Sequence, residues 1–172
     1  MSSREKLEPE LEEIQRFFNQ FHGETDRGAA LSAGAMLEDR LGDILIGFLV
    51  ESDQTAELFK GMNAPFGTLS SRISACLALG LIEQREFVEM EIIRRIRNKF
   101  AHNWDNITFE SDSVRDLTNN LPWRGPEEYE KTATSKDRFC TAMSMLMVDL
   151  VWRTRLVSKE RRVLKKWPNK TR

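Results

Sequence analysis

The stretch "EQREFVEMEIIRRIRNKFA", from Glu83 to Ala101, decides the fold class of this chain. Its apolar residues recur every three or four positions, and one row of them follows at intervals of four: Val88, Ile92, Ile96 and Phe100. This spacing is typical of an amphipathic α-helix that buries one face. The sequence therefore predicts a long helix here, with this row packed against the rest of the protein.

The same helical periodicity continues on both sides of that stretch. Helices are expected from about Pro9 to Phe21, from Thr25 or Asp26 through Val50, from Thr68 or Ser70 to Gly80, over 113–120, and from about Ser135 to Lys166. A short extended fragment fits Ile107 to Phe109, but no alternating pattern is long enough for a useful strand. The sequence predicts an all-α fold, a single-domain bundle over 1–172 of about five to seven helices with a long C-terminal helix.

Composition agrees with one globular domain inside the cell. The chain has 172 residues, 40% of them hydrophobic and 31% charged, and a domain of this length buries about 70% of its unfolded surface. Its two cysteines, Cys76 and Cys140, lie in apolar helical patterns, as buried thiols in a reducing compartment do. The longest apolar stretch, "LGDILIGFLV" (41–50), is short for a bilayer and contains Asp43. We expect a cytoplasmic protein that enters no membrane.

Charge is distributed unevenly along the chain. Residues 153–172 contain nine basic residues and one acidic residue, a net charge of +8, which leaves -9 for residues 1–152 because the whole chain carries -1. Such a basic tail predicts binding of RNA or DNA, or docking on an acidic face of the chain itself or of a protein partner; a solvated helix face is the simpler alternative. The candidate binding residues are Arg153, Arg155, Lys159, Arg161, Arg162, Lys165 and Lys166.

The last turns of the helix at Glu83 to Ala101 hold a second candidate site, "RNKFAH" (97–102). An arginine can clamp a phosphate with two hydrogen bonds, an asparagine can orient a group, and a histidine can transfer protons near neutral pH. Arg97, Asn98 and His102 could thus cut RNA by attack of its own 2'-hydroxyl, without a metal. Basic residues also interact favourably with the C-terminal end of a helix dipole, so a purely structural helix end explains the same residues.

The run from Arg97 to His102, with polar Asn98 next to the arginine and four residues in between, resembles the R-x4-6-H signature of HEPN domains. That resemblance implies an all-helical and often dimeric protein. It also implies that Arg97, Asn98 and His102 are catalytic and that RNA is cut at the dimer interface.

A longer part of the chain, roughly Glu24 to Asp112, resembles the MltR family, named for the mannitol operon repressor. The stretch "APFGTLSSRISACLALGLI" (64–82), after the earlier "ETDRG" (24–28), carries this resemblance. It implies a helical transcriptional regulator, and we expect a homodimer. The helix after Gly67 is too apolar for the base-reading helix of a helix-turn-helix, so regulation through a protein partner or through the basic tail is expected.

Cofactor and metal sites are not expected. The two histidines and two cysteines lie far apart without ligand spacing, and neither a glycine-rich phosphate loop nor a nucleophile elbow is present. Arg27 could point into the same cleft as Arg97, although capping by Thr25 or Asp26 accounts for that segment. The sequence thus favours an MltR-type regulator, with a HEPN-like, metal-independent ribonuclease as the alternative.

Overall fold

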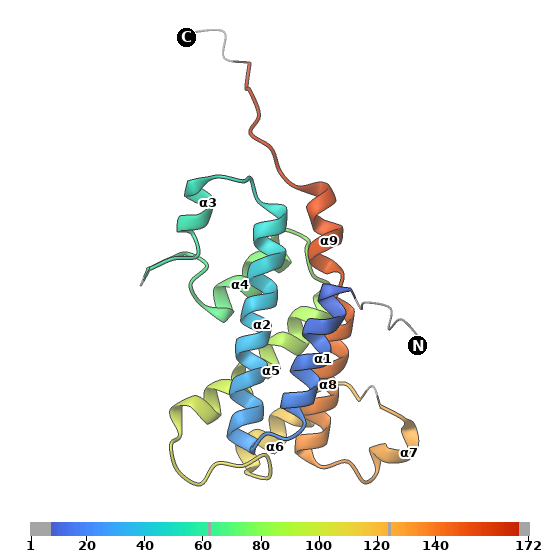
Figure 1. Ribbon diagram of the computed structural model, residues 1–172. Coiled ribbons are helices and arrows are strands. Elements are labelled where there is room, and N and C mark those ends of the chain that lie inside the picture. The colour runs from blue at the N-terminus through green and yellow to red at the C-terminus, as the bar shows by residue number, and fades with distance from the viewer. Residues whose placement is uncertain (1–7, 62, 124, 169–172) are drawn as a thin grey trace, which may run out of the picture.

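The computed structural model describes residues 8–61, 63–123 and 125–168, and over these residues the chain forms helices and no strands (Figure 1). The order is α1 (Pro9–Phe21), α2 (Asp26–Phe48), α3 (Asp53–Glu57), α4 (Leu69–Ala78), α5 (Gln84–His102), α6 (Asp112–Thr118), α7 (Glu127–Glu130), α8 (Ser135–Leu150), α9 (Arg153–Val157) and a 3-10 turn, η1 (Ser158–Glu160). Helices α1, α2, α4, α5, α6 and α8 are longer than five residues. The prediction of an all-α bundle is confirmed.

Helix α2 lies at the centre of the bundle, where it contacts α1, α4, α5, α8 and α9. Its first half presents small, fully buried residues, including Ala30 and Ala33, which let neighbouring helices approach closely. At Gly34 a Cβ atom would lie 2.6 Å from Cγ of Arg97 on α5, so this crossing requires glycine or a displaced arginine. One continuous apolar core runs from Ile14 to Val157, and the chain is therefore a single helical domain.

The predicted buried row on α5 is wrong at one end. Phe100 and Ile96 are fully buried, but Val88 is 49% exposed. Each step of four residues advances about 40° beyond a full turn, so three steps carry Val88 about 120° away from Phe100. Glu86 and Glu89 occupy the buried side instead, at 0% and 2% exposure.

The predicted C-terminal helix is also shorter than expected. Helix α8 ends at Leu150, a turn leads into α9, and the helical structure stops at Glu160 rather than Lys166. The backbone N–H of Arg162, which a continued helix would direct to its own preceding turn, donates to the carbonyl of Phe48 at 2.7 Å. The Arg161 Nε atom donates to the carbonyl of Gly47 at 3.2 Å. These two residues thus donate hydrogen bonds to carbonyls in the last turn of α2, which have no partner within the helix. Residues 161–168 form irregular structure that leads away from the body (Figure 1).

Local signals decided most of the other boundaries. Thr25 and Thr68 accept hydrogen bonds from the first turns of α2 and α4, as expected of N-caps. The short helices α3 and α7 were not predicted, and the Ile107 to Phe109 segment lies in a loop. Within the described residues, every helix is too short or too polar to span a bilayer.

Candidate functional site at the C-terminal end of α5

The first turn of α2 fixes the end of α5. Arg27 donates from its two terminal nitrogens to the carbonyls of Phe100 and Asn103, which lie at that end. Asp26 accepts a hydrogen bond from the backbone N–H of Phe109 at 3.0 Å and lies 3.4 Å from Nζ of Lys136 on α8. Thr25, one of the two caps that the sequence offered, caps α2. Arg27 caps a different helix, which the sequence alone did not indicate.

Arg97 packs across α2 instead of projecting from the helix end. Its aliphatic stem lies over Gly34, and its Nη1 donates to Oδ1 of Asn98 at 3.1 Å. Arg97 and His102 are five positions apart, or about 140° around the helix, so they do not share a face of α5. The hydrogen bond to Asn98 is the contact that links Arg97 to the rest of the motif.

Asn98 and His102 line a hollow of about 290 Å³ whose other lining residues are Arg95, Lys99 and Asn103. We call it the cationic hollow, because Arg95 and Lys99 line it and none of the described residues that line it is a carboxylate. Arg94, one position before it, instead forms a two-point pair with Glu91 at 2.8 and 2.9 Å. Arg95 and Lys99 were missed in the sequence, although their spacing of four places them on one face.

Three residues of the predicted basic site dock on the chain's own acidic groups. Arg153 pairs with the fully buried Glu86 at 2.8 Å and donates to the carbonyl of Leu81 at 2.7 Å. Two further pairs lie nearer the surface, with distances of 2.7 Å for Arg155 to Glu10 and 2.9 Å for Arg161 to Glu51. These three arginines therefore hold the end of the chain against the body.

The other four residues of the predicted basic site are exposed: Lys159, Arg162, Lys165 and Lys166. Arg162 lies over the ring of Phe48, 6.0 Å from its centroid. Three apolar side chains of residues 161–168 are also exposed, Val163 at 72%, Leu164 at 84% and Trp167 at 73%. Residues 161–168 thus present cations and apolar side chains together.

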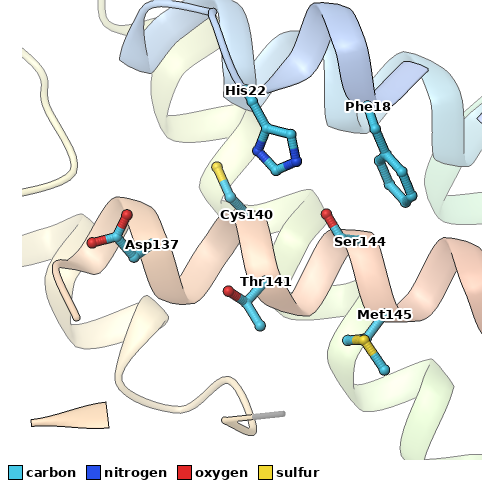
Figure 2. A pocket seen from close by; sticks show the side chains of 7 residues that line it. All are labelled: Phe18, His22, Asp137, Cys140, Thr141, Ser144 and Met145. Atoms are coloured by element: carbon cyan, nitrogen blue, oxygen red, sulfur yellow. The ribbon is translucent and has the colours of Figure 1, made fainter. Parts of the chain in front are cut away.

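A second hollow, also of about 290 Å³, lies between the end of α1 and one face of α8 (Figure 2). His22 and Phe18 face Cys140 and Ser144 across it, and the Cys140 sulfur points toward the histidine ring (Figure 2). Burial raises the pKa of Cys140 to about 11, so the thiol stays protonated at neutral pH and is a poor nucleophile. The Cys140 thiol is therefore not an activated nucleophile in this hollow.

Carboxylates gather at a third hollow, of about 400 Å³, which Glu13, Asp39 and Asp43 line together with Arg72 and other residues. Burial raises the pKa of Asp43, against the opposite effect of Arg40. Arg72 is anchored by hydrogen bonds to the carbonyls of Phe66 and Glu38 at 2.8 and 2.6 Å. Among the residues that the structure describes, no three histidine, cysteine, aspartate or glutamate side chains are grouped to hold a metal ion.

Comparison with known proteins finds one informative likeness. No family model matches the chain, and a search of curated proteins finds no match. Among solved structures, the chain is similar to a chain of "X-ray structure of the MtlR-HPr complex from Escherichia coli", with a TM-score of 0.56 and 18% sequence identity. The match covers 84% of this chain and 98% of that chain. At this identity the likeness shows the fold alone, and the chain therefore has an MtlR-like helical fold.

Proposed function

We propose that this protein is a transcriptional regulator of the MltR type that acts by binding a protein partner. The observation that supports this function is the fold shared with a chain of the MtlR-HPr complex, over 98% of that chain. Helix α4 offers no alternative through direct DNA reading, because Leu69, Ile73 and Cys76 face the core and Arg72 is anchored to backbone carbonyls.

HPr is the partner we propose, since it is the protein named beside MtlR in the matched structure. The exposed part of the basic tail is the candidate contact surface, because it combines Lys165 and Lys166 with the apolar Leu164 and Trp167. Apolar side chains next to cations can give both buried area and charge complementarity at an interface. We also propose that the protein is a homodimer, as the family resemblance implies, and that it is cytoplasmic, as its two cysteines in apolar helical patterns indicate.

Calorimetric titration with Escherichia coli HPr tests the proposal. We expect binding with a Kd on the order of micromolar, as suits a transient regulatory complex. Lys165→Glu together with Lys166→Glu should weaken it about tenfold or more, because two favourable charges become repulsive. Lys131→Glu, on a surface away from the tail, is the matched control. Light scattering on the protein without HPr should give twice the mass of the chain. A titration that releases no heat, together with no co-elution of the two proteins in gel filtration, would reject HPr as the partner.

A metal-independent ribonuclease is a second candidate, favoured by one observation. Asn98 and His102 line the same hollow, and Arg97 is hydrogen-bonded to Asn98. The motif is therefore contiguous in space although Arg97 and His102 lie on different faces of α5. A two-fold mate would have to complete such a site.

RNA cleavage in the presence of EDTA tests this second candidate. If the motif is catalytic, His102→Ala and Arg97→Ala should each lower the cleavage rate at least about 100-fold, as loss of an acid–base group or a phosphate clamp does. Arg94→Ala is the matched control, because Arg94 lies on the same helix but is paired with Glu91. Cleavage that survives in both motif variants, or that is absent from the wild type, would eliminate the ribonuclease.

A further inference from the structure

One face of helix α2 is hollowed along its second half. The carboxylate-lined hollow of about 400 Å³ lies at one end of this face, and a smaller hollow of about 190 Å³ lies at the other, beside α3 and Arg161. Ile46 lines both hollows and is 48% exposed, so the two meet at its side chain. We call them together the α2 groove. Its lining residues from the α2 side recur every three or four positions along the chain: Asp39, Gly42, Asp43, Ile46 and Val50.

The two ends of the α2 groove differ in polarity. Asp39 and Asp43 line one end and, within the part of the chain that the structure describes, have no hydrogen bond or ion pair. Burial raises the pKa of Asp43, because it disfavours a charge that nothing nearby fully compensates. Arg72 lines the same end, but its guanidinium is held by backbone carbonyls. Val50 and Ala56 line the other end. A matching ligand therefore has apolar side chains followed by cations.

Residues 163–168, which we call the terminal segment, have this order of side chains. Val163 and Leu164 come first and are 72% and 84% exposed, and the exposed Lys165 and Lys166 follow directly. Adjacent apolar side chains that stay in solvent mark an interaction site. The terminal segment leads away from the body of its own chain (Figure 1), so its apolar side chains are left for another molecule.

The length and the starting point of the terminal segment suit an exchange between two chains. Its six residues span at most about 20 Å when extended, whereas α2 rises only about 10 Å from Asp39 to Ile46. Arg161, just before the segment, lines the apolar end of the groove. A two-fold axis that passes near Arg161 places each terminal segment beside the groove of the other chain. Two identical contacts then close a dimer.

We propose that the terminal segment of one chain binds in the α2 groove of a second copy. Its apolar part packs on Ile46 and Val50. Its two lysines pair with Asp39 and Asp43. The inference rests on the homodimer proposed above, for which it names both contact surfaces. Since the terminal segment is also the candidate contact for HPr, the groove and HPr compete for it.

Sedimentation equilibrium without HPr tests the contact through its charges. The groove-reversed chain carries Asp39→Lys and Asp43→Lys, and the tail-reversed chain carries Lys165→Glu and Lys166→Glu. Each should raise the Kd of the dimer at least about tenfold, because attraction becomes repulsion. An equimolar mixture of the two chains should dimerise again, since each terminal segment then meets a groove of opposite charge. A segment bound in its own groove cannot give this result, because both have the same charge in each variant.

Glu127→Lys with Glu128→Lys is the matched control. It changes the net charge by the same amount as groove reversal, at exposed positions on α7, which lies at the other end of the bundle from the terminal segment (Figure 1). The Kd of its dimer should equal that of the wild type. Circular dichroism should show the same helical content in all variants.

Three results would overturn the exchange: a monomeric wild type, reversed chains that dimerise as the wild type does, or a mixture that stays monomeric. HPr titration of the groove-reversed chain separates this inference from the regulator proposal. Its terminal segment is free, so HPr should bind at least as tightly as to the wild type. A restored mixed dimer without any HPr heat upholds the exchange and rejects HPr. Loss of HPr binding with an unchanged dimer Kd assigns the groove to HPr and overturns the exchange.

Discussion

Replacing Arg153 with alanine is expected to lower the free energy of unfolding by about 3–5 kcal/mol, because it leaves a buried carboxylate without its counter-charge. Glu86 is 0% exposed and pairs with Arg153, whose side chain is 19% exposed. The same arginine donates to the carbonyl of Leu81, so one substitution removes a donor from two acceptors, the Glu86 carboxylate and the Leu81 carbonyl. Urea unfolding followed by circular dichroism measures the effect.

Two further variants isolate the cause. Arg155→Ala removes an arginine only two positions away, but its partners Glu8 and Glu10 are on the surface, so the unfolding midpoint should hardly change. Glu86→Gln added to Arg153→Ala should recover part of the loss, because a neutral amide is less costly to bury than an unpaired carboxylate. Equal destabilisation by Arg153→Ala and Arg155→Ala would contradict this account of the pair.

Phe139→Ala is expected to destabilise the protein by a similar amount, about 3–5 kcal/mol, through loss of buried area and the cavity that remains. The Phe139 ring is fully buried and lies 5.0 Å from Phe109 and 6.4 Å from Phe21. Phe109 in turn lies 5.0 Å from Phe100. This ring cluster joins α8 to α1, to the end of α5 and to the loop after it, so the cavity would open at the junction of four segments.

The measurement for Phe139→Ala is the urea midpoint at an unchanged denaturant slope. Tyr129→Ala, which removes an aromatic ring that is 59% exposed, is the control and should leave the midpoint nearly unchanged. A small effect of Phe139→Ala, comparable to that of Tyr129→Ala, would mean that the ring cluster does not hold these segments together.

The sequence alone predicted the helices whose boundaries depend on neighbouring residues. The predicted limits of α1, Pro9 and Phe21, agree with the structure, and the predicted caps Thr25 and Thr68 begin α2 and α4. A cap satisfies backbone N–H groups within three residues, and apolar periodicity marks a buried face without knowledge of its partner. Both signals are local, so the fold class followed from them.

Features that depend on distant partners were not predicted. The C-terminal helix stops short of Lys166 because Arg161 and Arg162 bond to the last turn of α2, more than 100 residues earlier in the chain. Glu86 is buried because Arg153 reaches it from α9. A charged residue in a helix pattern is normally solvated, and only the paired charge shows otherwise.

The candidate site was likewise predicted only in part. The sequence by itself determined its chemistry, since Arg97, Asn98 and His102 stand at the end of a helix whatever surrounds them. Only the tertiary structure decided which of these groups face solvent: Gly34 on α2 receives the stem of Arg97, while Arg95 and Lys99 join His102 around an open hollow. Spacing in sequence fixes positions around one helix, but the neighbouring helices decide which of those positions are covered.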